Sequence, residues 1–310
     1  MPTCMGQPLR MFEPERIYFI TNRTLQGRLL MRPSKTINNT VGGIIAKAQE
    51  KYAVDIFAFV FTSNHFHIML RAKEGQISNF MMYLESNIAR KVGREVDWHG
   101  KFWERRFSAE PILDDDALLG RMRYIFSHGV KEGLVETPEQ WPGLTSIPEI
   151  VHGMKRLFPW HDWSKFTRVR QRKKHLTRNH FVDFHKIVLS RLPAFEELNE
   201  KDYQALMRNL LNQAKAHGRE QHGHKNVLGK QRILNQHPHT KPKNVKRSNR
   251  PACHTTCPMI RQRFKESYRA FRQAYEQASA AFRSGEWDIA FPAFSFKPPI
   301  PYYLLVPEPI

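Results

Sequence analysis

The chain has 310 residues, and its 49 lysines and arginines outnumber its 29 aspartates and glutamates, giving a formal net charge of +20. Residues 1–150 carry 19 basic and 17 acidic side chains, whereas residues 151–310 carry 30 and 12. Hydrophobic residues make up 41% of the chain and aromatic residues 12%, which excludes wholesale disorder because a sizeable core can form. The uneven charge favours a polyanionic partner, nucleic acid above all, over the alternative of a soluble protein with basic solvated faces.

The composition also sets expectations for the compartment. No stretch approaches the roughly 18 consecutive apolar residues of a membrane-spanning helix, and the first residues lack the pattern of a signal peptide. The three cysteines are too few for a disulfide framework and fit a reducing environment. We therefore expect a cytoplasmic protein without a membrane partner.

The first half alternates between strand and helix patterns. Short runs rich in β-branched and aromatic residues predict strands at 16–21, 54–60 and 65–70, with a weaker extended segment at 102–112. Apolar residues at helical spacing predict helices at 36–51, 77–92 and 117–128, the last opened by three aspartates and stopped by Gly129. The order favours an α+β, ferredoxin-like antiparallel sheet with helices on one face over a doubly wound fold. Because no glycine-rich phosphate loop is present, nucleotide-driven chemistry is not expected.

The motif with the clearest chemistry is His65-Phe66-His67. On a strand, residues i and i+2 point to the same face, so the two imidazoles would stand side by side with Phe66 anchored in the core. This geometry suits two ligands of one divalent cation. The alternative is a pair of ordinary half-buried strand histidines. The other His-x-His pairs, at 222–224 and 237–239, show no strand pattern.

A second signal lies in the helix predicted at 117–128. Leu118, Met122 and Ile125 define its buried stripe, and Tyr124 falls outside that stripe. His128 follows Tyr124 by four residues, so the two side chains share a flank one turn apart. A phenol beside a third metal ligand suits nucleophilic phosphoryl chemistry. The alternative is a tyrosine at the edge of the core and a histidine stabilised by the helix dipole.

Five segments occur in an order and spacing that point to one family. They are Ser63-Asn64-His65-Phe66-His67-Ile68-Met69-Leu70, Phe102-Trp103-Glu104-Arg105-Arg106-Phe107, Arg123-Tyr124-Ile125, Lys131-Glu132-Gly133-Leu134-Val135 and Trp141-Pro142. Together they resemble the single-tyrosine HUH transposases of the insertion-sequence-200-like superfamily, especially the REP-associated tyrosine transposases of bacteria. The resemblance covers residues 12–150, which we expect to form an HUH domain.

The resemblance implies a ferredoxin-like fold, Mg²⁺ or Mn²⁺ as cofactor, and single-stranded or hairpin DNA as partner. By position it implies that His65, His67 and His128 hold the metal and that Tyr124 is the nucleophile. This chain has His128-Gly129 where members of the REP-associated branch usually show Asn-Pro. Trp103 and Arg106 match an element that is structural or contacts DNA. Three histidines would also suit Zn²⁺, so the identity of the cation comes from the family and not from the ligands.

The activity implied is cleavage and rejoining of single-stranded DNA through a 5′-phosphotyrosine. The alternative from another class is a nucleic-acid-binding protein on the same scaffold that does not cut. A homodimer is compatible with the sequence, which does not decide whether the tyrosine acts in its own subunit. In a bacterial cell such a protein would associate with the nucleoid when bound to DNA.

Residues 151–310 are expected to form a basic, mainly helical DNA-binding region, with helices at 202–216 and 260–282. Between 155 and 186, ten basic residues alternate with aromatic ones, a mixture that suits unpaired strands. Residues 221–265 hold eleven lysines and arginines and no acid, and a mobile basic arm is expected near 221–259. Its proposed DNA contacts are Lys241, Lys243, Lys246, Arg247 and Arg250. The aromatic stripe of the 260–282 helix favours core packing over base stacking.

Overall fold

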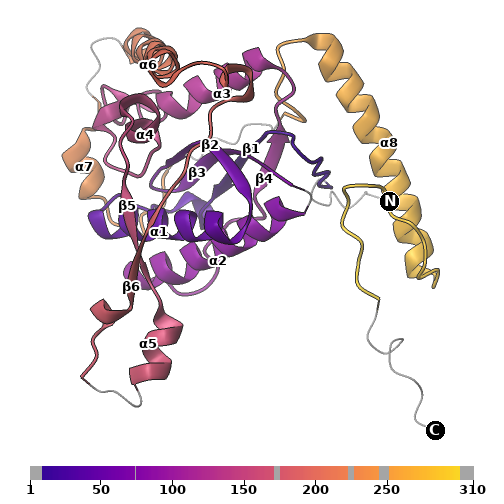
Figure 1. Ribbon diagram of the computed structural model, residues 1–310, viewed down its shortest axis with the longest axis horizontal. Helices are drawn as coiled ribbons and strands as arrows, with labels where there is room; N and C mark the ends of the chain where they lie inside the picture. Colours follow the sequence, from indigo (N-terminus) through magenta and orange to yellow (C-terminus); the bar gives the residue numbers. More distant parts are fainter. Residues whose placement is uncertain (1–8, 74, 171–174, 223–226, 244–250, 301–310) are drawn as a thin grey trace.

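The computed structural model describes residues 9–73, 75–170, 175–222, 227–243 and 251–300 (Figure 1). Its centre is a four-stranded antiparallel sheet with strand order β2-β3-β1-β4. The strands are β1 (Tyr18–Arg23), β2 (Val54–Phe61), β3 (His65–Ala72) and β4 (Ser108–Pro111). Helix α1 (Lys35–Lys51) joins the first two strands and α2 (Gln76–Glu95) joins the last two. This order of elements and strands confirms the predicted ferredoxin-like α+β fold.

Both faces of the sheet are buried. Alternate residues of the strands, such as Ile20 and Ile68, pack with α1 and α2 in one hydrophobic cluster. Their neighbours Phe19 and Met69 pack in a second cluster with α3 (Asp115–Ser127) and α6 (Glu200–His222). Helices were expected on one face of the sheet only. Helices α1 and α2 cover that face, but α3 and α6 cover the opposite face. The second layer is needed because β2 has apolar residues on both of its faces, and both must be buried.

The helix that carries the tyrosine has well-defined ends. The side chain of Asp114 accepts a hydrogen bond from Ala117 N at 2.7 Å, which caps the first turn of α3. The last turn ends at Ser127, with His128 as the C-cap residue and Gly129 at φ 92°, a conformation that favours glycine. The predicted stop at Gly129 is therefore observed, and it turns the chain directly after His128.

The second half contributes to the same body of the molecule. Its helices and strands are α4 (Ile147–His152), β5 (Leu157–His161), α5 (Trp163–Arg170), β6 (Val182–Lys186), α6, α7 (Lys230–Leu234) and α8 (Pro258–Arg283). Short 3₁₀ helices lie at Leu25–Gly27, Pro138–Gln140, Arg178–Phe181 and Pro193–Phe195. Because α6 shares a core with α3, the two halves of the sequence do not form separate cores.

The two-stranded ribbon β5–β6 was not predicted. It packs on α1, where Gly42 and Gly43 leave room for it. A Cβ atom at Gly42 would lie 2.2 Å from the ring of Phe158, and one at Gly43 would lie 2.2 Å from the carbonyl oxygen of Pro159. Phe158 is 4% exposed, so this aromatic residue of the basic segment serves the core.

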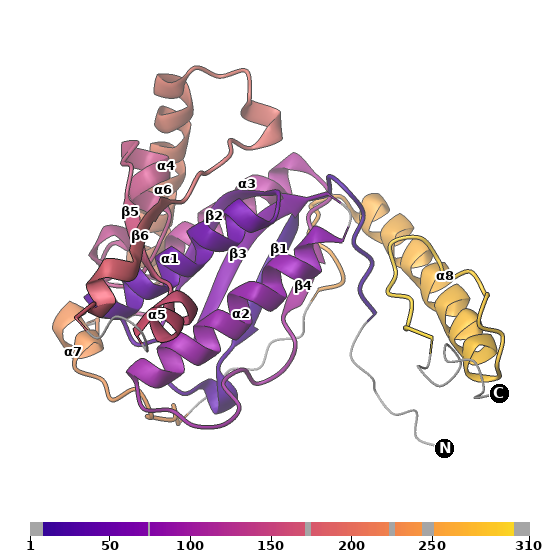
Figure 2. The same ribbon diagram turned by 60° about the horizontal axis from the view of Figure 1, so that its bottom comes forward.

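Helix α8 lies beside the sheet body in both views (Figures 1 and 2). Its aromatic stripe packs along the helix and against the segment that follows it, with Phe282 in contact with Trp287 and Phe291. Tyr268 donates a hydrogen bond to the carbonyl oxygen of Leu9, which ties α8 to the N-terminal segment. Packing, and not an open stacking surface, is therefore the arrangement observed for this stripe.

The segment expected to be a mobile arm contains ordered contacts. Residues 230–234 form α7, and His254 makes a parallel bridge with Ile112 beyond β4. Asp114 accepts hydrogen bonds from Thr255 Oγ1 and Thr256 N, so the start of α3 holds this segment in place. Residues 223–226 and 244–250 lie outside the described residues, as do 301–310 of the proline-rich tail. Within the described ranges, no helix is long and apolar enough to cross a membrane.

Candidate metal and tyrosine site

Strand β3 presents the two histidines on one face. In the antiparallel pairing with β1, His67 lies opposite Thr21 and His65 lies opposite Arg23. Between them Phe66 turns to the other face, where it is fully buried and stacks on Phe61. The strand alternation predicted for His-Phe-His is therefore present, and it places both imidazoles toward α3.

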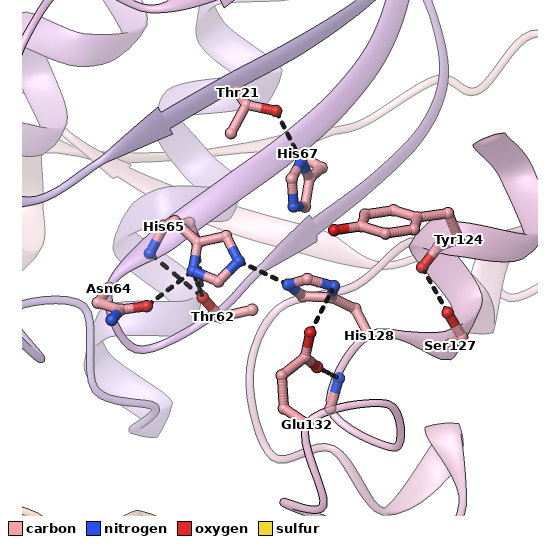
Figure 3. Close-up of polar contacts among 10 residues, drawn as sticks. Thr21, Thr62, Asn64, His65, His67, Tyr124, Ser127, His128 and Glu132 are labelled. Atoms are coloured by element: carbon pink, nitrogen blue, oxygen red, sulfur yellow. Dashed lines mark hydrogen bonds and ion pairs between the residues drawn. The ribbon is translucent and has the colours of Figure 1, made fainter. Parts of the chain in front are cut away.

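The end of α3 brings a third imidazole to this pair (Figure 3). Nε2 of His128 lies 2.6 Å from Nε2 of His65, and the ring centroids of His128 and His67 are 4.8 Å apart. One nitrogen from each of the three histidines lies within 4.8 Å of the others. Residues 65, 67 and 128 thus converge from two elements that are far apart in the sequence.

Neighbouring polar groups orient each ring. Thr21 Oγ1 lies 2.7 Å from Nδ1 of His67, and Nδ1 of His65 lies 2.7 Å from Asn64 Oδ1 and 2.9 Å from Thr62 Oγ1. These contacts direct the Nε2 atoms of both histidines toward the centre of the cluster. These supporting residues were not predicted from the sequence. Thr21 lies opposite His67 in the β1–β3 pairing, so it could have been identified only once that pairing was known.

Glu132 supports the third ring. One of its carboxylate oxygens lies 3.6 Å from Nδ1 of His128, and the other accepts a hydrogen bond from Gly129 N at 2.7 Å. The carboxylate therefore fixes the turn that ends α3 and lies behind the imidazole, whose Nδ1 has no hydrogen-bond partner among the described residues. A carboxylate behind a metal-bound histidine orients the ring and raises its basicity. Glu132 follows His128 by four residues, and this spacing was the only sign in the sequence that Glu132 could support the histidine.

Burial keeps the three imidazoles neutral. It lowers the pKa values of His65 and His67 well below their usual range, and the neighbouring His128 adds to this effect. Burial, with a smaller effect of Lys131, lowers the pKa of His128 to about 3. Neutral imidazoles are the form that binds metal ions, so the cluster is ready to bind at neutral pH.

The donor set fits a divalent cation. Nε2 of His67 is buried and has no hydrogen-bond partner among the described residues, which is a cost that a metal bond would remove. Among the described residues the metal-ligand cluster consists of histidines alone, without a carboxylate. Asp114 is instead used as the cap of α3.

Tyr124 stands beside this cluster. Its ring centroid lies 5.2 Å from that of His67 and 5.5 Å from that of His128, and its hydroxyl end points toward the histidines (Figure 3). The Arg121 guanidinium carbon and Lys131 Nζ lie 4.9 Å and 4.7 Å from the ring centroid. Burial raises the pKa of Tyr124, with a contribution from Glu132, while Arg121 opposes the rise.

Four of the seven expected DNA contacts fall within the described residues. Trp103 is 9% exposed, packs edge-on against Phe66, and donates from Nε1 to the carbonyl oxygen of Glu85 at 3.0 Å. Its burial favours the structural role. Arg106 is exposed beside β4, and Lys241 and Lys243 are exposed in the C-terminal half. The remaining three candidates, Lys246, Arg247 and Arg250, lie outside the described residues.

Comparisons with known proteins bear on this constellation. Residues 31–128 match the family model described as "Transposase IS200 like". A curated relative from Haemophilus influenzae, named "Putative REP-associated tyrosine transposase", is 28% identical over 105 residues. The match covers 30% of this chain and 59% of the relative, so the chain spans less than two thirds of that protein's length.

Among solved structures, one of a REP-associated tyrosine transposase bound to a REP hairpin aligns with a TM-score of 0.42 and 20% identity. That alignment covers 48% of this chain and 86% of the other. The family match begins before α1 and ends at His128, so it contains the three histidines and the tyrosine. The resemblance seen in the sequence is confirmed: residues 31–128 match the IS200-like transposase family, and the chain is similar to a REP-associated tyrosine transposase.

Proposed function

We propose that this protein is a metal-dependent tyrosine transposase, a strand transferase that cleaves and rejoins single-stranded or hairpin DNA through a 5′-phosphotyrosine. The observation that carries the proposal is the position of Tyr124, whose ring lies within 5.5 Å of two members of a three-histidine cluster. The match of residues 31–128 to the IS200-like transposase family supports this reaction class. The DNA substrate would place the protein at work in the bacterial cytoplasm.

The chemistry needs help because phosphodiester oxygens repel a nucleophile. A divalent cation held by His65, His67 and His128, Mg²⁺ or Mn²⁺ by analogy with the family, would neutralise that charge and make the phosphorus more electrophilic. The three imidazoles suit this role because they are neutral and oriented. Thr21 and Glu132 hold two of the rings in place, so binding requires little reorganisation.

Tyr124 would supply the nucleophile. Its phenolic oxygen forms a bond to phosphorus, the bond to the 3′-oxygen breaks, the phenolic proton passes to solvent, and the 3′-oxygen takes up a proton. Burial disfavours the phenolate, and the Arg121 guanidinium beside the ring offsets part of that cost, although the pKa of Tyr124 stays raised. The phosphotyrosine keeps the energy of the broken ester, so a second 3′-hydroxyl can attack it and rejoin the strand without ATP.

The arrangement also favours action within one subunit. Tyr124 and the three histidines are contributed by the same chain and lie side by side in it. Mixing a Tyr124→Phe variant with a His67→Ala variant is therefore expected to restore no activity. Restored cleavage in the mixture would show that the tyrosine works across a dimer.

The direct test is a covalent adduct. The protein is incubated with Mn²⁺ or Mg²⁺ and a labelled pool of single-stranded DNA hairpins with random flanking sequence, and a band that resists denaturation is sought. We expect the adduct in the wild type, no adduct in Tyr124→Phe, and none after chelation with EDTA.

Tyr52→Phe is the matched control, because this tyrosine ends α1 and packs against Tyr83, away from the histidines. It should form the adduct as the wild type does. Wild-type protein that binds the pool but forms no adduct with either cation would contradict the enzymatic proposal. That result would leave the second candidate, a non-catalytic DNA-binding protein on the same scaffold.

A further inference from the structure

A basic and aromatic cleft lies between α2 on one side and the end of β5 with α5 on the other. Its volume is about 490 Å³. Its lining includes four cationic residues, which are Arg90, Lys91, Arg94 and Arg168, and two tryptophans, Trp160 and Trp163. Asp162 is the carboxylate in this lining, and its side chain accepts a hydrogen bond from Lys165 N at the start of α5. We call this feature the α2–α5 cleft after the two helices that border it, which are labelled in Figure 2.

Cationic side chains of the cleft contact the faces of its tryptophan rings. Lys91 Nζ lies 3.2 Å from the ring centroid of Trp160 and donates to the carbonyl oxygen of His161, and the same indole stacks on Tyr83. The guanidinium carbon of Arg94 lies 5.3 Å from the ring centroid of Trp163. Trp160 is therefore engaged by Lys91 and Tyr83, while the half-exposed Trp163, which also packs against His161 and Phe166, forms the wall of the cleft.

This lining matches the chemistry of an unpaired nucleotide. Lysine and arginine neutralise phosphates, and indole faces stack on bases only where the bases are not paired. Burial also lowers the pKa of Lys91 to about 8, which an added phosphate would reverse. We propose that the α2–α5 cleft binds single-stranded DNA, with a base against Trp163 and backbone phosphates held by Arg90, Arg94 and Arg168.

The cleft is separate from the catalytic cluster. Residues of β3 alternate, so His65 and His67 face α3, whereas Phe66 and Ile68 face α1 and α2 on the other side of the sheet. The wall that contains Trp163 lies beyond the family match, which ends at residue 128. The cleft would therefore hold DNA that flanks the cut segment, and it rests on the proposed function in that respect.

The test measures binding of labelled oligothymidylate to the full chain by fluorescence anisotropy at several salt concentrations. Trp163→Ala should weaken binding about 5-fold or more, because stacking on an aromatic ring contributes strongly per base, and Trp163→Phe should recover most of the affinity. Arg94→Gln should also weaken binding and reduce the slope of log K against log salt by about 0.7 for each phosphate that is no longer neutralised. Arg269→Gln on α8 removes the same charge outside the cleft and should change affinity much less.

Three results would overturn the assignment: unchanged affinity in Trp163→Ala and Arg94→Gln, an equal weakening in Arg269→Gln, or tighter binding of double-stranded DNA or of RNA than of single-stranded DNA. The adduct assay keeps the two proposals apart. If the adduct is absent from the wild type while the cleft variants bind DNA more weakly, the cleft stands and the enzymatic proposal fails.

Discussion

Gly43→Ala is a sharp test of how the β5–β6 ribbon is held on the transposase domain. The new Cβ would lie 2.2 Å from the carbonyl oxygen of Pro159 and 3.0 Å from its carbonyl carbon. This approach is about 1 Å closer than van der Waals contact. No side-chain rotation can relieve the clash, because the two atoms that the Cβ meets belong to the backbone of Pro159. The ribbon has to move away from α1.

The magnitude follows from two opposing effects. Alanine favours a helix over glycine by about 1 kcal/mol, which by itself would stabilise α1. Displacing the ribbon re-exposes part of Phe158, now 4% exposed, and full burial of such a side chain contributes about 2–3 kcal/mol. Overpacking of this kind typically costs about 1–3 kcal/mol, so we expect a net decrease of about 1–2 kcal/mol in the free energy of unfolding.

Urea unfolding measures this decrease, and Gly120→Ala is its matched control. Gly120 lies in α3, and apart from the backbone of its own helix and its chain neighbours no atom of the described residues lies within 4 Å of the Cβ position, so alanine there should stabilise the protein by about 0.5–1 kcal/mol. The two substitutions are thus expected to have opposite signs. Because the ribbon leads into α5, Gly43→Ala should also weaken single-stranded DNA binding at the α2–α5 cleft. A Gly43→Ala protein as stable as Gly120→Ala would refute the packing argument.

Two further predictions concern carboxylates. Glu132→Ala should lower the affinity for Mn²⁺ about 10- to 100-fold in calorimetry, because His128 loses its orienting partner. Glu132→Gln should lower that affinity less, because it keeps the hydrogen bond from Gly129 N. Equal affinities in the wild type and both variants would exclude this support role of Glu132. Burial raises the pKa of Glu85 from 4.5 to about 7, although Asn22 and Arg10 favour its charged form, so its stabilising contribution is present at low pH and is lost as pH rises toward 7. Glu85→Gln should therefore be about 3 kcal/mol more stable than the wild type at pH 8 and nearly equal to it at pH 4 in urea unfolding, and a difference independent of pH would contradict the raised pKa.

The local elements of the domain could be predicted from the sequence because they depend on short-range periodicity. Alternation along β3 was enough to place His65 and His67 on one face, and the stripe of α3 was enough to set Tyr124 apart from the core. The stop at Gly129 followed from the conformational freedom of glycine, which the positive φ there requires. The family resemblance then linked these local signals into one site.

What periodicity could not supply was the packing between distant segments. The ribbon β5–β6 was missed because residues 162–181 separate its strands and their composition is mixed, and its place depends on the space left by two glycines of α1. Trp103 matched an element that is structural or contacts DNA, and only its position in the core beside Phe66 favours the structural role.

By itself, the sequence predicted which residues would carry the chemistry, and it determined a cationic C-terminal half and the ferredoxin-like order of strands and helices. Only the tertiary structure decided that His128 reaches the strand pair, that Thr21 and Glu132 hold the rings, and that tryptophans and arginines form a separate cleft. The physical reason is the same in each case. Short-range pattern fixes the direction of a side chain relative to its own strand or helix, whereas the distance between two elements depends on how all the buried side chains between them pack.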